Sequence, residues 1–326
     1  VFRQLRGFGE YGFPESHAAG FALIAYISAW LKYHYPAAFC CALLNSLPMG
    51  FYSASQLVQD AQRHQVAILP ADLNLSAWDS CLTTSATGAT AIRIGLRRIK
   101  GLRASAGLSL LLHRPDAGYQ QIHQLERVPG LSRADLDALA SADALAQISG
   151  HRFQARWQTA ALNQQQDLLS TAFTDDDHSL AAPDEFENLI ADQNSTGLSL
   201  RKHILQLLRE KELLPATPTA DQLLDLALTA QRKPHRLKDA KVQIPIVVSG
   251  LITNRQMPKT ATGVTFITLE DHTGNINVIV WLAVAQQHLR TLTTDTLVII
   301  KGLLEKAPES DVIHVIAQEI KGFSHV

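Results

Sequence analysis

The chain carries IKGLRASAG at residues 99–107 and repeats its layout as VPGLSRADL at residues 128–136. Each stretch runs from an apolar residue through a spacer to glycine, leucine and a helical pattern. Glycine permits a tight turn and a close approach of backbone to a phosphate, and the following helix directs free N–H groups and a positive dipole end at an anion. The pair predicts a grip on two stretches of nucleic-acid backbone without sequence reading. The alternative is a helical hairpin whose glycine turns hold no ligand.

Basic charge gathers around these two stretches. The whole chain has 326 residues and a net charge of −1, which excludes a uniformly basic nucleic-acid binder. Between Ala91 and Arg133, however, eight basic residues face only Asp116 and Glu126, a local net charge of +6. A local patch of this kind favours binding to the DNA backbone. The candidate contacts are Arg97, Arg98, Lys100, Gly101, Arg103, Gly130 and Arg133.

An apolar run, AAGFALIAYISAWL, covers residues 18–31. It is shorter than the ~20 residues that cross a bilayer, so we predict a buried core helix and no membrane span. A glycine-rich loop over residues 7–17 precedes it and ends in Ser16 and His17. A hydroxyl and an imidazole at a helix start suit a phosphate. A core helix capped by His17 is the alternative.

The stretch from Asp167 to Asp192 holds eight acidic residues and no Lys or Arg. This composition predicts a mobile linker. Just before it lies QQDLL, at residues 165–169, which has the pattern of a short peptide that docks into an apolar groove. The end of the preceding helix is the alternative.

Strand patterns dominate residues 241–326. Five strands with a helix after the third fit an OB barrel, a fold that binds single strands through basic grooves and aromatic side chains. The basic and acidic residues of this part nearly balance, so it has no excess of positive charge to attract the phosphates of a single strand. The candidate contacts in the barrel are Arg255, Lys259 and Phe266.

The sequence offers no convincing catalytic centre. Two-metal nucleotidyl transfer needs clustered carboxylates, and the Asp135/Asp137 pair falls on a predicted surface helix. Motifs of serine hydrolases, zinc proteases and P-loop enzymes are absent from the sequence. Three cysteines without a CxxC pair fit a reducing cytoplasm. We predict no catalytic residue and no metal site in this chain.

Residues 7–39 read GFGEYGFPESHAAGFALIAYISAWLKYHYPAAF. They closely resemble the fingers segment of bacterial C-family DNA polymerases, the alpha subunits of polymerase III, in the motifs Tyr11-Gly12-Phe13, Ser16-His17-Ala18-Ala19 and Ala29-Trp30-Leu31-Lys32. The housekeeping replicase usually has Asn-Lys where this chain has Pro14-Glu15, so the chain resembles the error-prone, damage-inducible branch. Residues 43–66 and 195–205 support that branch, and residues 263–281 match the OB domain of the family.

The resemblance implies a multidomain α+β fold with four parts in order. These are the end of the α-helical fingers (1–88), a tandem helix-hairpin-helix DNA-binding domain (89–160), an acidic linker with helices (161–240) and a C-terminal five-stranded OB-fold β-barrel (241–326). It places Tyr11, Ser16 and His17 near the incoming nucleotide's triphosphate or the template pair. The catalytic aspartates and Mg²⁺ of the family belong to a palm upstream of this segment. Since the chain starts at Val1 with residues typical of the middle of a domain, we expect a fragment that does not polymerise alone.

The implied activity is damage-induced translesion synthesis by an error-prone DNA-directed DNA polymerase. Implied partners are primer-template DNA with its single-stranded template, deoxynucleoside triphosphates, the mutasome companions ImuA and ImuB, and the sliding clamp. For the clamp, Gln165, Asp167, Leu168 and Leu169 lie where replicative relatives carry a clamp peptide, without the usual final phenylalanine. Family hairpins often have a second glycine at the position of Arg103, so we expect Arg103 to contact phosphate through its charge.

Two other functions remain open. One is a non-catalytic DNA-binding or scaffold module, which the presence or absence of upstream carboxylates would distinguish. The other is the same segment of the accurate replicase. Pro14-Glu15, and an end soon after the barrel, favour the error-prone branch over the replicase.

Overall fold

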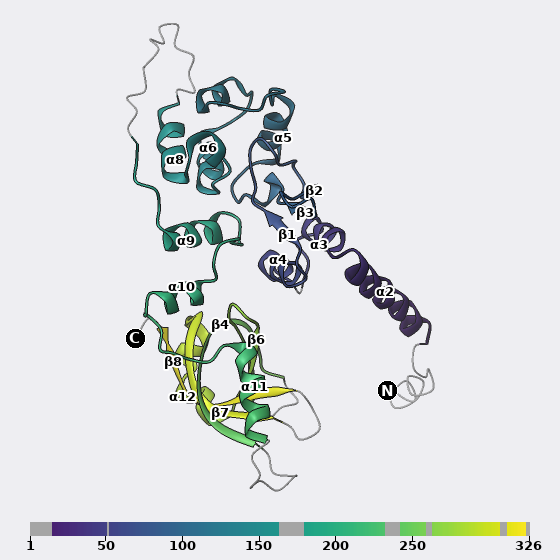
Figure 1. Cartoon of the computed structure of the whole chain (residues 1–326), viewed down its shortest axis with the longest axis vertical. Helices are drawn as coiled ribbons and strands as arrows, with labels where there is room; N and C mark the ends of the chain where they lie inside the picture. Colours follow the sequence, from purple (N-terminus) through teal and green to yellow (C-terminus); the bar gives the residue numbers. More distant parts are fainter. Residues whose placement is uncertain are drawn as a thin grey trace, which may run out of the picture. The chain divides into compact units, whose positions relative to one another are not determined.

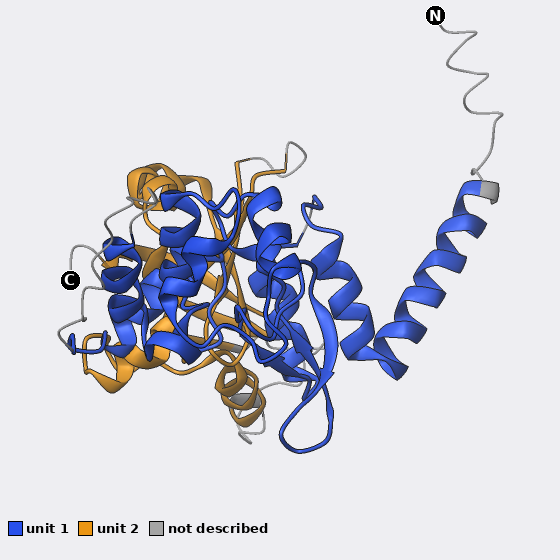
Figure 2. Ribbon diagram, turned by 90° about the horizontal axis from the view of Figure 1, so that it is seen from above, with its two compact units in different colours: residues 1–201 blue, residues 202–326 orange. Residues whose placement is uncertain are grey.

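The structure is a computed structural model that describes residues 15–50, 52–162, 179–231, 242–258, 263–306 and 312–323. It divides into two compact units, residues 1–201 and residues 202–326 (Figure 2). The first unit contains helices and a small sheet, and the second contains a barrel (Figure 1). The predicted multidomain α+β class is therefore confirmed.

The first described element is α2 (Glu15–His34), a helix that extends away from the rest of the first unit (Figure 2). The predicted helix over residues 18–31 is confirmed, but its predicted burial is wrong: Phe21 is 58% exposed and Tyr26 is 70% exposed. A helix that is apolar all round normally lies inside a protein. The apolar pattern indicates that other residues cover this helix, but the pattern does not identify those residues. Within the described residues, no helix is long and apolar enough to cross a membrane.

Two more helices and a small sheet follow. Pro36 occupies the first turn of α3, and Ser53 begins α4 with a capping box, as the sequence predicts. The sheet has the order β1-β3-β2, with β1 parallel and β2 antiparallel to β3. The bounds are α3 (Pro36–Asn45), α4 (Ala54–Arg63), β1 (Ala67–Leu69), β2 (Cys81–Thr84) and β3 (Thr90–Arg93).

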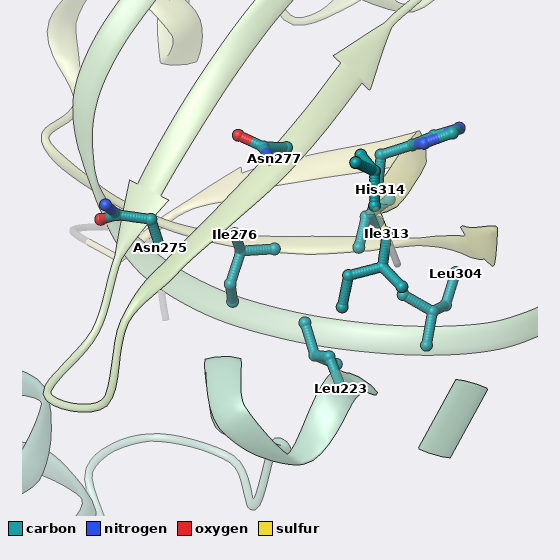
Figure 3. Close-up of a pocket in the computed structure, with 9 residues that line it drawn as sticks. Leu223, Asn275, Ile276, Asn277, Leu304, Ile313 and His314 are labelled. Carbon is teal, nitrogen blue, oxygen red and sulfur yellow. The ribbon is translucent and has the colours of Figure 1, made fainter. Parts of the chain in front are cut away.

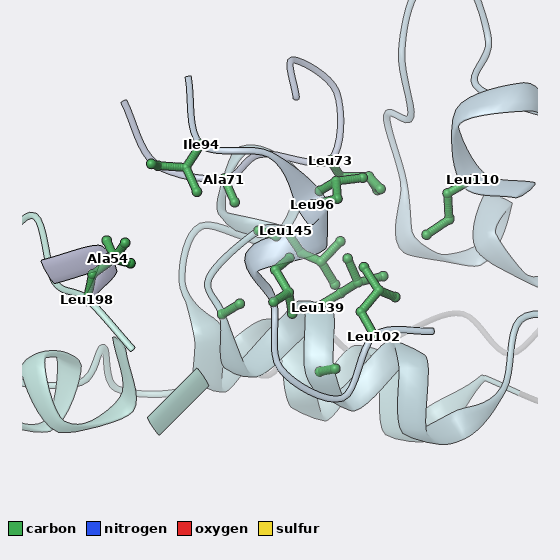
Figure 4. Close-up of a cluster of buried hydrophobic side chains, with 14 of the residues drawn as sticks. Ala54, Ala71, Leu73, Ile94, Leu96, Leu102, Leu110, Leu139, Leu145 and Leu198 are labelled. Carbon is green, nitrogen blue, oxygen red and sulfur yellow. The ribbon is translucent and has the colours of Figure 1, made fainter. Parts of the chain in front are cut away.

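One continuous hydrophobic core joins the parts of the first unit (Figure 4). Ala54 and Leu73 come from before residue 88, and Leu96, Leu139 and Leu198 come from after it, yet all five belong to one buried cluster. Residue 88 itself lies in the turn between β2 and β3. Packing is therefore continuous across the predicted boundary at 88/89. The assignment of residues 1–88 to the fingers and of residues 89–160 to the DNA-binding domain stays a prediction.

The two glycine stretches lie in the helical part of this unit. The 3-10 helix η1 (Leu96–Arg98) precedes α5 (Ala104–Leu112), and η2 (Ile122–Arg127) precedes α6 (Arg133–Ser141). α7 (Ala146–Ser149) and α8 (Arg152–Ala161) complete the group, and α8 packs on α6.

Part of the predicted mobile linker is a well-formed helix, α9 (Glu185–Ser195), so the linker prediction is wrong for these residues. Asp184 caps α9 through a capping box with Glu187, because carboxylates are stabilised at a helix N-terminus. Asp192 accepts a hydrogen bond from the buried Arg152, with 2.5 Å between Oδ1 and Nη2. Acidic composition alone did not reveal these local partners. Residues 163–178 lie outside the described residues.

The second unit is a closed five-stranded barrel in the order β4-β5-β6-β8-β7. All neighbouring strands pair antiparallel except β6 and β8, which pair parallel. This is the connectivity of the predicted OB fold, with two short helices where one was predicted. The bounds are α10 (Ile204–Glu210), α11 (Ala220–Gln231), β4 (Val242–Gln256), β5 (Thr265–Glu270), β6 (Asn275–Val280), α12 (Leu282–Gln287), α13 (Leu289–Thr294), β7 (Leu297–Lys306) and β8 (Ile313–Gly322).

Helix α11 closes one side of the barrel core. Leu223 and Ala227 of this helix belong to the buried cluster of the barrel. The buried Asp271, in the turn between β5 and β6, accepts the N–H of Ala220 at 2.9 Å and thereby caps the start of α11. The strand turn and the helix are thus fixed to one another.

Candidate nucleic-acid interface

The two glycine turns have the local geometry that the sequence predicts. Gly101 has a φ of +86° and Gly130 has a φ of +75°, a region that glycine adopts without steric cost. α5 begins three residues after Gly101, and α6 begins three residues after Gly130. Both turns therefore join a left-handed glycine to a helix N-terminus, which is an arrangement suited to a backbone phosphate.

The C-terminal end of α9 contacts the first turn at Lys100, while Lys100 and Gly101 stay exposed. The backbone N–H of Lys100 donates to the carbonyl oxygen of Ser195 at 2.7 Å, and Lys100 Nζ donates to the carbonyl oxygen of Gln193 at 3.1 Å. Carbonyl groups at a helix C-terminus carry partial negative charge and attract a cation. Two donors of Lys100 are thus engaged within the protein, although its side chain stays near the surface.

The second turn is open. Pro129 and Gly130 are exposed, and a Cβ placed on Gly130 would meet no atom within 4 Å. In the part of the chain that the structure describes, the N–H groups of Gly130 and Leu131 have no acceptor; at the first turn the N–H of Gly101 has none either, while that of Leu102 donates to the carbonyl oxygen of Ile99. The exposed Arg133 stands at the start of α6, where its Nη1 donates to the carbonyl oxygen of Ala160 at 2.7 Å. Among the described residues, this turn therefore combines free amides with a positive charge that no carboxylate neutralises.

Arg97 and Arg98 lie close together on η1 but differ in their surroundings. Arg97 Nη1 is 2.7 Å from Asp79 Oδ1, so its charge is largely compensated. Arg98 is half-buried, and burial, followed by the nearby Arg97, lowers the pKa of its guanidinium. Its Nε is buried without a hydrogen-bond partner among the described residues.

Arg103 is committed to an internal ion pair. Its Nη2 lies 2.5 Å from Asp135 Oδ2, and Asp135 is 0% exposed. The prediction that Asp135 lies on a surface is therefore wrong: the residue is on α6, but it faces the other hairpin. Because Asp79 and Asp135 lie outside the window from Ala91 to Arg133, the local charge of +6 overstates the free positive charge of this patch.

The residues that the sequence places near a nucleotide are only partly described. Tyr11 lies outside the described residues, as do Gln165, Asp167, Leu168 and Leu169 of the candidate clamp peptide. Ser16 lies in the first turn of α2, where only its backbone is described. His17 is exposed and its ring centroid lies 4.5 Å from that of Phe21.

The barrel presents an uncharged strip across β4, β5 and β6. Phe266, 39% exposed, lies between Gln256 and Ile279 in the strand register. The neighbouring outward row consists of Asn254, Thr268 and Asn277. One row can stack against a base and the other can donate and accept hydrogen bonds. None of the six side chains carries a charge.

The other two barrel candidates add little to this strip. Arg255 is exposed, and its Nη2 donates to the carbonyl oxygen of Asp295 at 2.7 Å. Lys259 lies outside the described residues.

A small hollow lies between β6, β8 and α11 (Figure 3). Leu223, Ile276 and Leu304 line it together with the polar Asn277 and His314. Its volume of about 200 Å³ is below the roughly 300–1,000 Å³ of pockets that enclose a small molecule. We therefore assign it no cofactor. Among the described residues, no three His, Cys, Asp or Glu side chains gather as metal ligands.

The sequence analysis did not identify the carboxylates and carbonyl oxygens that pair with the basic side chains. Asp79 and the α9 carbonyls are far from their partners in sequence, so no local pattern predicts these contacts. The position of Asp135, in contrast, could have been predicted in part from a local pattern. Ser132 and Asp135 have the spacing of a capping box, and the structure has this box at the start of α6.

Tandem glycine turns before helices, together with a five-stranded barrel of OB connectivity, define a nucleic-acid-binding segment. Family models agree: a helix-hairpin-helix motif matches residues 65–155 and an OB-fold nucleic acid binding domain matches residues 246–321.

Relatives identify the larger protein that contains such a segment. The chain is 44% identical over 321 residues to an error-prone DNA polymerase of Hahella chejuensis, 46% over 327 residues to one of Idiomarina loihiensis, and 44% over 327 residues to one of Vibrio parahaemolyticus. These matches cover 98–100% of this chain but about 30% of each relative. The chain is thus homologous over its whole length to a segment of the error-prone DNA polymerases.

Proposed function

We propose that this chain is the C-terminal, DNA-holding portion of an error-prone DNA-directed DNA polymerase that acts in the cytoplasm in damage-induced translesion synthesis. The observation that carries this proposal is the pair of glycine turns within a chain that matches error-prone DNA polymerases from end to end. The exposed α2 also supports it, because a helix that is apolar all round needs a partner from a larger core.

The task of the hairpins is to hold the primer-template duplex without reading its sequence. Backbone amides and arginines contact phosphates, which are the same at every base pair. A polymerase must move along its template, so such contacts suit it better than contacts to base edges. The contact residues of this proposal are Gly130 and Arg133 at the second turn.

The task of the barrel is to hold the single-stranded template. Its strip around Phe266 supplies an aromatic face and amide side chains rather than cations. Stacking on an aromatic ring is worth about 1–3 kcal/mol per base and tolerates any base. A weak, sequence-tolerant grip of this kind would let damaged bases pass.

Catalysis belongs to the palm outside this segment. The polymerase would need Mg²⁺ to stabilise the charge that develops during nucleotidyl transfer, and the described residues present no ligand set that fits it. Tyr11, Ser16 and His17 would contact the deoxynucleoside triphosphate or the template pair from the fingers. ImuA and ImuB would recruit the polymerase, and residues 165–169 would be its contact to the sliding clamp.

Binding to DNA tests the proposal. The chain is titrated by fluorescence anisotropy with a labelled primer-template, a blunt duplex and a single strand over a series of KCl concentrations. We expect duplex affinity to fall linearly with salt on a logarithmic scale, by about 0.9 per phosphate neutralised, and single-strand affinity to depend less on salt. A chain that binds none of the three DNAs would refute the proposal.

Primer extension tests the role in a polymerase. We expect this chain alone to extend no primer, while a protein that joins it to the upstream part of the polymerase does. Within that protein, His17→Ala should raise the KM for nucleotide or lower kcat. Unchanged kinetics would remove His17 from the nucleotide site.

A further inference from the structure

The side chain of Arg103 crosses from the first hairpin to the second. Arg103 occupies the N-cap position of α5 without a side-chain capping bond, and its guanidinium reaches the turn before α6. Nη2 donates to the carbonyl oxygen of Gly130 at 2.8 Å, and Nε lies 3.2 Å from each carboxylate oxygen of Asp135. The planar fork of arginine suits such a set of fixed acceptors.

Asp135 receives donors from both hairpins. The backbone N–H of Arg103 donates to Oδ1 at 3.1 Å, and the backbone N–H of Ser132 donates to Oδ2 at 2.9 Å. The Ser132 hydroxyl also donates to Oδ2, at 2.5 Å. One buried carboxylate therefore joins the N-cap residues of two helices, Arg103 of α5 and Ser132 of α6.

The charges of this pair compensate one another, with the carboxylate buried and the Arg103 side chain 53% exposed. Burial would raise the pKa of Asp135, yet the hydrogen bonds from Arg103 and Ser132 hold it well below its usual range. The hydrogen bond to Asp135 raises the pKa of Arg103 in turn. The guanidinium of Arg103 is thus neutralised, unlike that of Arg133, whose acceptor is an uncharged carbonyl.

We propose that Arg103 is a positioning residue: through Asp135 and the Gly130 carbonyl it fixes the second hairpin turn so that the amides of Gly130 and Leu131 face a nucleic-acid phosphate. This inference rests on the proposed DNA-binding function. It differs from the expectation that Arg103 contacts a phosphate through its own charge, and the two roles predict opposite results.

The first experiment changes the carboxylate. Asp135→Asn and the matched control Asp137→Asn each remove one negative charge from α6, two residues apart, in the 326-residue chain. Affinity for a labelled blunt duplex is measured by anisotropy, and folding is checked by circular dichroism. Loss of a negative charge should tighten DNA binding if charge alone matters. A positioning role predicts instead that Asp135→Asn weakens binding about tenfold, while Asp137→Asn does not weaken it.

The second experiment changes the arginine and does not depend on Asp135→Asn folding. Arg103→Lys keeps the charge but cannot make the forked contact, and Arg103→Gln removes both. A positioning role predicts similar losses of affinity in the two variants, with the salt slope of each unchanged. Wild-type binding by Arg103→Lys, with a slope lower by about 0.9 for Arg103→Gln, would show a direct phosphate contact and overturn the proposal.

The outcomes separate this inference from the proposed function. If the wild-type chain binds no duplex, the DNA-binding function itself fails. If the wild type binds and Asp135→Asn binds equally well or more tightly, only the positioning role of Arg103 fails.

Discussion

The two hairpin turns share a sequence layout and a backbone conformation, but they differ in what surrounds them. At the first turn, the amide and ammonium groups of Lys100 donate to the end of α9. At the second, the Gly130 carbonyl accepts from Arg103, a Cβ on Gly130 would meet no atom within 4 Å, and among the described residues its N–H has no acceptor. The Gly101 N–H at the first turn also has no acceptor among the described residues, so the difference lies in the end of α9, which engages Lys100 beside that turn.

This difference shows that a repeated motif need not repeat a function. The end of α9 contacts the first turn, and Arg103 follows that turn in the chain. The second turn remains available to a ligand. Both turns keep the same backbone conformation because each needs a glycine with positive φ. The contacts added around one copy then decide which copy can still bind.

The largest expected effect comes from releasing α9 from the first turn. Arg152, whose side chain is 2% exposed, lies 2.5 Å from Asp192 of α9 and donates to the carbonyl oxygen of Ser141. Arg152→Gln removes one of the two arginines that pair with Asp192, while Arg201 Nε stays 3.3 Å from Asp192 Oδ2, so it should lower the free energy of unfolding by about 1.5–3 kcal/mol. Urea unfolding of the chain, followed by circular dichroism, measures this loss.

The control is an exposed ion pair whose arginine lies on the same helix as Arg152, α8, and whose aspartate lies on α6. Arg156 and Asp137 are 3.2 Å apart and both more than half exposed, so Arg156→Gln should change the free energy of unfolding by less than about 1 kcal/mol. Equal losses in the two variants would mean that Arg152 does not anchor α9.

A smaller effect separates the two glycines. Gly101→Ala and Gly130→Ala each force a side-chain residue into a left-handed conformation, at a cost of about 1–2 kcal/mol. Both should lower the free energy of unfolding alike, but only Gly130→Ala should also weaken duplex binding substantially. Parallel unfolding and anisotropy titrations measure the two quantities. Equal losses of affinity would show that both turns bind phosphate and that the contrast between them is wrong.

The smallest effect is a pH dependence of the link between the hairpins. The pKa of Asp135 is lower in the folded chain than in the unfolded chain. Its carboxylate therefore stabilises the fold fully above the unfolded pKa of about 4, and this stabilisation declines as the pH falls below that value. The difference in unfolding free energy between wild type and Asp135→Asn should stay constant from neutral pH to about 5 and shrink below about 4. A difference that grows on acidification would contradict the assigned ion pair.

Local patterns predicted most of the fold. Proline at the start of α3, the cap at Ser53, two glycines before two helices and five alternating strands all mark features that neighbouring residues determine. These elements form where the sequence places them. The predicted barrel connectivity also holds, because the order of strands and helix leaves few alternatives.

Long-range partners could not be predicted from such patterns. The apolar residues of α2 indicated burial, yet they are exposed among the described residues. The acidic residues near α9 indicated a linker, yet Asp192 pairs with Arg152, forty residues before it. For the candidate site, the sequence identified the turns and the basic side chains, but not which of them Asp79, Asp135 and α9 already occupy.

Hydrogen exchange of the chain, with and without a blunt DNA duplex, tests the central claim most directly. Without DNA, we expect the Lys100 amide to exchange slowly and the Gly130 and Leu131 amides to exchange fast, because only the first has an acceptor. With DNA, protection should appear in peptides that span residues 128–136 and change little in those that span residues 99–107. New protection at residues 99–107 with none at residues 128–136 would contradict the assignment of the phosphate to the second hairpin.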